Sequence, residues 1–284
     1  MIEVKDLRFT YPGNTERALH GLNFVVQHGE IFGFLGPSGA GKTTTQNLLI
    51  GLLKEYEGHV RILDQDLRSI TPDFYERIGV AFEFPNFYTK FTARENLGYY
   101  RSLYRGETEN PDSLLEMVGL TGDSDTRVGG FSKGMRMRLN FCRALLNKPK
   151  LLFLDEPTAG LDPANARRIR EIITTKQTQG VTVFLTTHNM TVADQLCDRV
   201  AFIVDGRIVL IDSPRELKIR NSNKIVRVEY RENGILKQSD YPMEGLTENR
   251  EFLSILGEKD IETLHSQEAT LEDIFIQTTG ERLQ

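Results

Sequence analysis

The sequence predicts an α/β fold built on a parallel sheet with helical crossovers. A short apolar run at residues 30–35 leads directly into a glycine-rich turn, and a helical pattern follows at about 41–51. Two further apolar runs, at 151–154 and 181–186, are separated by a stretch with a helical pattern. Because apolar strands that alternate with helices form parallel sheets, these segments are expected to share one sheet.

The remaining segments suggest additions to this core. Residues 2–9 and 22–27 alternate apolar and polar side chains, which is typical of strands with one solvent-facing side. Residues from about 92 to 146 show helical patterns only, so a helical subdomain is expected there. After a break at DSPREL, the composition changes. The expected domains are residues 1–213, with the helical subdomain inside, and residues 214–284, a small α+β piece. In that piece KIVRVEY and ILKQSDY are expected to be short strands, and TLEDIFIQTTG is expected to be one of about two helices.

Composition limits the class of protein. The 284 residues are 39% hydrophobic and 26% charged, with a net charge of −5, and no apolar run approaches the roughly 18 residues of a membrane span. The scattered Lys and Arg residues argue against a nucleic-acid groove as the main surface. The N-terminus does not resemble a secretory signal, so a cytoplasmic protein is expected. Cys142 and Cys197 are expected to be small buried hydrophobes.

The glycine-rich turn matches GxxxxGK[ST], between a predicted strand and a predicted helix. Its glycines let backbone N–H groups converge on phosphates, and the helix N-terminus favours an anion. Lys42 adds a cation for the β- and γ-phosphates, and the Thr43 hydroxyl can bind Mg²⁺. A plain glycine turn would leave Lys42 unexplained. The predicted ATP-binding loop comprises Gly36, Pro37, Ser38, Gly39, Ala40, Gly41, Lys42, Thr43 and Thr44.

Candidate catalytic residues follow the other apolar strands. Asp155 and Glu156 end the first run, at the edge where the phosphate loop is expected. Asp155 suits a Mg²⁺ ligand and Glu156 a general base for water. The segment alone would favour a solvated pair at the end of a strand, and the phosphate loop upstream reverses that preference. His188 follows the next run and could contact the γ-phosphate and hold the attacking water. Phosphoryl transfer needs this kind of positioning and charge neutralisation.

Together these residues resemble the ATP-binding cassette (ABC) transporter ATPases over at least residues 1–211. The most specific element is FSKGM at 131–135, which is similar to the family signature usually written LSGGQ and keeps Ser132 and Gly134. The resemblance implies that Ser132 and Gly134 face ATP held by a second subunit, so that hydrolysis requires a dimer. It also implies that Tyr11 stacks on adenine and that Asp162 lies in the loop joining the two nucleotide sites.

Glu83 departs from the family pattern. The family usually has a glutamine here that touches Mg²⁺ and the transmembrane partner, and a carboxylate can bind the metal but cannot donate as an amide does. The expected metal ligands are therefore Thr43, Asp155 and Glu83. A solvated strand-end residue is the alternative for Glu83. The aromatic stretch from Phe82 to Phe91 could be core or a groove for a helix of the membrane subunit.

The resemblance implies an ATPase that uses ATP and Mg²⁺, works as a homodimer or heterodimer, and powers a separate transmembrane permease from the cytoplasmic face of the membrane. It favours export, and the substrate and the role of residues 214–284 stay open. One alternative is a soluble ABC ATPase acting on nucleic acid or ribosomes, although such proteins usually carry two cassettes, a long coiled coil or zinc-binding cysteines. The other is a non-hydrolysing regulatory module, yet Lys42, Asp155 and Glu156 are all present.

Overall fold

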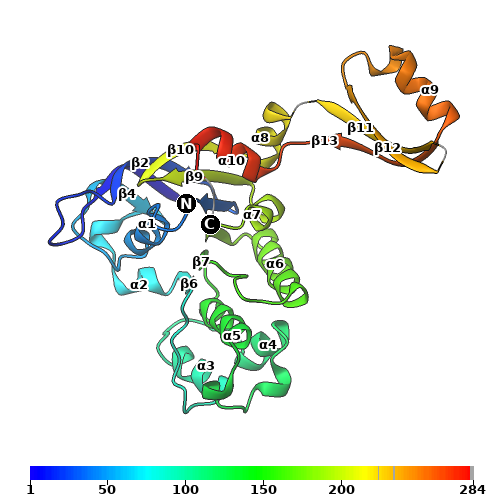
Figure 1. Cartoon of the computed structure of the whole chain (residues 1–284). Coiled ribbons are helices and arrows are strands. Elements are labelled where there is room, and N and C mark those ends of the chain that lie inside the picture. The colour runs from blue at the N-terminus through cyan, green and yellow to red at the C-terminus, as the bar shows by residue number, and fades with distance from the viewer. Residues whose placement is uncertain (223, 233, 282–284) are drawn as a thin grey trace. The chain divides into compact units, whose positions relative to one another are not determined.

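The computed structural model describes residues 1–222, 224–232 and 234–281. The chain divides into two compact units, one from Met1 to Ile211 and one that begins at Asp212. Figure 1 shows the elements of both units, coloured in order along the chain. No helix in the described ranges is long and apolar enough to cross a membrane.

A six-stranded sheet forms the centre of the first unit, in the order β10-β9-β3-β8-β7-β6. The pairs β3/β8, β3/β9, β7/β8 and β6/β7 are parallel, and the apolar runs predict this arrangement for β3, β7 and β8. Every residue of β3, β7 and β8 is buried, because helices and a second sheet cover both faces. The strands are β3 (Ile31–Leu35), β6 (Ile78–Ala81), β7 (Leu151–Asp155), β8 (Thr182–Thr187), β9 (Arg199–Val204) and β10 (Arg207–Asp212).

A second, antiparallel sheet packs against this one, in the order β2-β1-β4-β5. The contact is aromatic: the Phe24 ring of β2 lies 5.7 Å from Phe32 and 5.6 Å from Phe34, both on β3. Burying one such side chain contributes about 1.5–3 kcal/mol to the stability of the fold. The aromatic cluster therefore holds β3, the strand that leads into the glycine loop, against the second sheet. The strands are β1 (Ile2–Phe9), β2 (Leu19–Val26), β4 (Glu57–Ile62) and β5 (Gln65–Asp66).

Helices of the first unit fall into two groups. The helices that connect strands are α1 (Lys42–Leu49), α2 (Pro72–Tyr75), α6 (Pro163–Thr178) and α7 (Met190–Leu196). Three others form a group of their own, of which α5 also packs against β6: α3 (Ala93–Arg101), α4 (Pro111–Met117) and α5 (Lys133–Leu145) (Figure 1). Each of these three begins at a side-chain cap, from Thr92, Asn110 and Ser132 respectively, which satisfies amides of the first turn. Short 3-10 turns lie at Leu67–Ser69, Thr121–Asp123 and Val128–Gly130.

The second unit is a three-stranded antiparallel sheet, in the order β12-β11-β13, with helix α9 packed on one face. Val226, Val228 and Tyr230 alternate along β11 and pack with Phe252 and Ile255 of α9. The strands are β11 (Ile225–Glu232), β12 (Ile235–Pro242) and β13 (Asp260–Gln267), and the helices are α8 (Pro214–Asn221), α9 (Arg250–Glu258) and α10 (Leu271–Thr279), with a 3-10 turn at Leu246–Glu248.

Candidate nucleotide site

A cavity of about 300 Å³ lies where the neighbouring strands β3, β8 and β7 end. Carboxyl ends of parallel strands meet at one edge of a sheet, so residues far apart in sequence converge there. The loop after β3, the end of β7 and the residue after β8 all contribute. The cavity is lined by Ser38, Gly39, Gly41, Lys42, Thr43, Thr44, Glu83, Asp155, Glu156 and His188.

Glycines shape the loop between β3 and α1. Gly39 and Gly41 have φ of +84° and +106°, a region that other residues rarely adopt. A Cβ on Gly36 would lie 2.1 Å from the Ile203 carbonyl oxygen, so a side chain cannot fit there. The first-turn amides of α1 have no acceptor within the helix, and they face the cavity from its N-terminus. This is a cradle for an anion such as a phosphate chain.

Lys42 is the cation of this cradle. Its Nζ donates to the carbonyl oxygens of Gly36 at 2.6 Å and Pro37 at 2.8 Å, which fixes the side chain across the loop. Burial lowers the pKa of Lys42, and the carboxylates of Glu156, Asp155 and Glu83 oppose that shift. The ammonium therefore sits between a loop that binds anions and a group of acids.

Glu156 is held by hydrogen bonds on both carboxylate oxygens. Oε2 accepts from the Thr187 hydroxyl at 2.8 Å, and Oε1 accepts from the backbone N–H of His188 at 2.7 Å. Oε1 also lies 2.5 Å from Nδ1 of His188. Glu156 is buried and has φ of +47°, a strained conformation for a residue other than glycine. The carboxylate is thus fixed in one orientation at the cavity wall.

Asp155 pairs in register with Thr186 of β8, and the Thr186 hydroxyl donates to its Oδ1. Burial raises the pKa of Asp155, the Thr186 hydrogen bond opposes this, and the charges of Glu156 and Glu83 add to the rise. A cation placed beside Asp155 would relieve this unfavourable charge.

The oxygens of Thr43, Asp155 and Glu83 fit Mg²⁺. In the described part of the chain, no three His, Cys, Asp or Glu side chains are close enough to form a complete metal site. Mg²⁺ is usually held by one or two carboxylates together with substrate phosphates and water, and does not need an all-protein cage. A hard cation with nucleotide therefore suits this donor set.

The other predicted binding residues lie outside the cavity lining. The Tyr11 hydroxyl is 2.9 Å from the Thr44 hydroxyl of α1, and the Tyr11 ring packs edge-on against Phe9. Pro37 and Ala40 lie in the glycine loop between β3 and α1 but do not line the cavity. Ser132 caps α5 by accepting from the Met135 amide. The residues of the predicted set that do not line the cavity are Tyr11, Gly36, Pro37, Ala40, Ser132, Gly134 and Asp162.

Asp162 caps α6 in the structure. Its carboxylate accepts from the amides of Ala164 and Asn165, both at 3.1 Å, and from the Asn165 side chain. These bonds, the Asn165 side chain foremost, lower the pKa of Asp162. The residue therefore fixes the end of the loop that follows Glu156.

Thr186 and Thr187 hydrogen-bond the two acids but are not among the site residues predicted from the sequence. Both are buried on β8 and donate to Asp155 and Glu156 respectively. The signal was present in the sequence, because two polar residues end an otherwise apolar strand immediately before His188.

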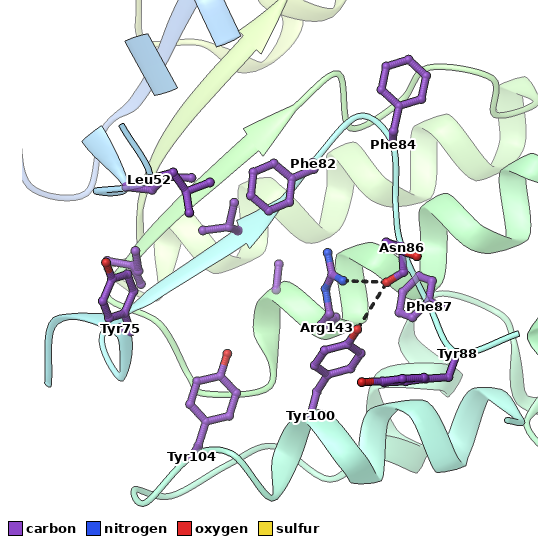
Figure 2. A pocket seen from close by; sticks show the side chains of 14 residues that line it. Leu52, Tyr75, Phe82, Phe84, Asn86, Phe87, Tyr88, Tyr100, Tyr104 and Arg143 are labelled. Atoms are coloured by element: carbon purple, nitrogen blue, oxygen red, sulfur yellow. Dashed lines mark hydrogen bonds between the residues drawn. The ribbon is translucent and has the colours of Figure 1, made fainter. Parts of the chain in front are cut away.

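A second hollow, of about 550 Å³, lies between the strands and the helices α3 and α5. Figure 2 shows Leu52, Tyr75 and Phe82 on one side and Tyr88, Tyr100 and Tyr104 on the other. Arg143 lies over the rings of Phe87 and Tyr100, with the guanidinium carbon 5.1 and 5.2 Å from their centroids. Arg143 and Tyr100 both donate to the Asn86 carbonyl, at 3.1 and 3.3 Å.

The fold and this site define a P-loop ATPase with a helical subdomain between its strands. A family model described as "ABC transporter" matches residues 19–159, and one described as "Fluoroquinolone efflux ABC transporter C-terminal domain" matches residues 224–268. The chain is 55% identical over its full length, and over 94% of the relative, to a "Fluoroquinolones export ATP-binding protein" of Mycobacterium tuberculosis.

Solved structures of ATP-binding cassettes have the same fold as this chain. A dimeric ATP-binding cassette bound to ADP and Pi matches with a TM-score of 0.66 at 28% identity, covering 75% of this chain and 98% of that one. A Clostridium perfringens protein, described as part of an ABC transporter complex, matches with a TM-score of 0.67 at 27% identity, covering 76% and 89%. The chain belongs to the ABC transporter family: it is an ATP-binding, ATP-hydrolysing subunit of the kind that powers export.

Proposed function

We propose that this chain hydrolyses Mg²⁺-bound ATP in the 300 Å³ cavity and thereby drives export of fluoroquinolones through a separate transmembrane subunit. The observation that carries the chemical part is the position of Glu156. Its carboxylate is oriented by Thr187 and His188 at the wall of a cavity that Lys42 and the glycine loop line.

In this proposal Glu156 is the general base. Its Oε1 and Oε2 are held by donors from β8, so the carboxylate can take a proton from water without first reorienting. His188 holds Glu156 through Nδ1, and its half-exposed side chain lines the cavity, where it is proposed to contact the γ-phosphate. Lys42 and the loop amides hold the phosphates.

The metal would be held by Asp155, Thr43 and Glu83. Mg²⁺ supplies charge neutralisation on the phosphates when bound. Asp155 is suited to this role because it is buried beside two other acids, and Thr186 fixes its orientation. Tyr11 is proposed to stack on adenine, since its ring lies beside α1 through the Thr44 contact.

A second cassette is proposed to complete each site. Ser132 and Gly134 do not line the cavity of their own chain, and they lie at the N-terminus of α5, the end of a helix that favours an anion. They are therefore available to a nucleotide held by another subunit. The dimer can be a homodimer or a heterodimer. Asp162, at the start of α6, is proposed to lie at the same interface.

The 550 Å³ hollow is proposed to take a helix of the transmembrane subunit. It is lined mainly by aromatic and aliphatic side chains, of which Phe84 is 77% exposed. Apolar grooves of this kind bind amphipathic helices. This contact would place the chain at the cytoplasmic face of the membrane as a peripheral subunit.

The substrate class rests on the relatives. The full-length match to a fluoroquinolones export protein and the separate match of residues 224–268 support fluoroquinolones. The test measures how much of a fluorescent fluoroquinolone accumulates in cells that express the chain together with its transmembrane subunit. We expect lower accumulation than in cells with the Lys42→Ala variant. Equal accumulation in the two strains, with both subunits present in the membrane, would overturn the substrate assignment.

A further inference from the structure

Glu83 is a third carboxylate in the nucleotide cavity and differs from the other two in its contacts. Asp155 accepts a hydrogen bond from Thr186, and Glu156 accepts from Thr187 and His188. The Glu83 side chain has no hydrogen bond or ion pair within the described ranges, although it lines the same cavity. Within the described ranges its charge is therefore offset only at a distance, by the Lys42 ammonium, and not by a direct contact.

The charge balance of the cavity is negative. Among the residues that line the cavity, Lys42 is the single Lys or Arg, whereas three are acids: Glu83, Asp155 and Glu156. Glu83 acts on the other groups, since its charge contributes to the pKa of both Lys42 and Asp155. A triphosphate without a metal would add several negative charges to this cavity.

We propose that Glu83 makes nucleotide binding conditional on a divalent cation, by repelling metal-free nucleotide and attracting the metal-bound form. The inference rests on the proposed use of Mg²⁺-bound ATP. A glutamine at this position is neutral, and it offers the metal one oxygen without repelling the phosphates. A carboxylate repels the metal-free triphosphate and binds a hard cation well. It therefore increases the difference in affinity between metal-bound and metal-free nucleotide.

The expected size follows from Coulomb's law. One unit charge roughly 10 Å from another, at an effective dielectric constant near 20, interacts by an amount that corresponds to roughly a tenfold change in affinity. Because Glu83 is partly exposed, solvent screening reduces its repulsion of each phosphate charge. The triphosphate carries several such charges, and their repulsions add up. An effect of about tenfold is therefore expected.

The test is calorimetric titration with a non-hydrolysable ATP analogue, in EDTA and in Mg²⁺, for wild type, Glu83→Gln and Glu83→Ala. Glu171→Gln is the matched control, because Glu171 lies on α6 in a surface ion pair with Arg167 and its loss changes net charge equally. We expect the ratio of Kd in EDTA to Kd in Mg²⁺ to fall about tenfold in both Glu83 variants, chiefly through tighter binding in EDTA, and to stay unchanged in Glu171→Gln.

An unchanged ratio in the Glu83 variants, or an equal change in Glu171→Gln, would overturn the inference while leaving the proposed function intact. Failure of the proposed function looks different. In that case wild type would not bind the analogue in Mg²⁺, or Lys42→Ala would bind it equally well.

Discussion

Oε1 of Glu156 lies 2.5 Å from Nδ1 of His188 and also accepts the backbone N–H of the same residue at 2.7 Å. The two residues come from adjacent parallel strands, Glu156 directly after β7 and His188 directly after β8. The contact therefore depends on strand register, and it joins the proposed base to a second residue that lines the cavity. Loss of either partner should affect hydrolysis more than folding.

Replacing His188 with alanine tests this relationship. The side chain is 49% exposed, so we expect the melting temperature to change little. Hydrolysis should fall by about a hundredfold, because the contact that positions Glu156 is lost. Phosphate release and thermal melting give the two readouts, with His28→Ala, an exposed histidine outside the cavity, as control. A rate within twofold of wild type would contradict the assignment.

Asp155→Asn should stabilise the protein in the absence of nucleotide and metal. Burial raises the folded-state pKa of Asp155, so the folded state holds its proton more tightly than the unfolded state. Protonated Asp155 therefore contributes to the stability of the folded state. This contribution is fully present below the ordinary pKa of about 3.9 and is lost as the pH rises through the raised folded-state pKa. We expect the variant to melt above wild type at pH 8, with the gap narrowing toward pH 4. A gap that does not depend on pH would show that charge is not its cause.

Phe84→Ala tests the proposed docking groove. The Phe84 side chain points away from the other labelled residues in Figure 2 and is 77% exposed, so truncation should leave melting and ATP binding unchanged. Co-purification with the transmembrane subunit should fall several-fold, since exposed aromatic anchors carry much of the energy of such interfaces. Val209→Ala, which removes an exposed apolar side chain of β10, is the control. Equal recovery of partner with both variants would argue against the groove.

Glu232 in the second unit gives a prediction that does not depend on function. Hydrogen bonds from Lys237 and Lys259 lower the pKa of Glu232 to about 2. Its stabilising contribution is present above the ordinary glutamate pKa and is lost as pH falls through that lowered value. A carboxyl NMR titration should show the low value in wild type and a rise toward about 4.3 in Lys237→Ala, but not in Lys54→Ala. Titration of wild-type Glu232 near 4.3 would contradict the ion-pair geometry.

Much of the first unit could be predicted because each segment carries a strong local signal. The apolar runs at β3, β7 and β8 and the glycine loop gave the parallel sheet and the position of its functional edge. In the second unit, the alternation of β11 and the apolar residues of α10 indicated a strand and a helix. Strand β13 was not anticipated, because its side chains are mostly exposed and give no clear apolar alternation.

The parts that could not be predicted depend on contacts between distant residues. Thr186 and Thr187 orient Asp155 and Glu156 only because β7 and β8 pair in one particular register. The groove at Arg143 needs α5 to lie beside the loop at Asn86, which no local pattern specifies. Strand order and helix packing are set by the tertiary structure, so the sequence indicates the acids and His188 but not the threonines that orient the acids.

The most direct test of the account is single-turnover ATP hydrolysis by purified Glu156→Gln together with its transmembrane partner. The amide keeps the shape of the side chain but cannot accept a proton as a carboxylate does. We predict that the variant binds Mg²⁺-bound ATP with an affinity near that of wild type and releases phosphate at least about a hundredfold more slowly. Hydrolysis at the wild-type rate would contradict the assignment of Glu156 as the base and, with it, the proposed mechanism.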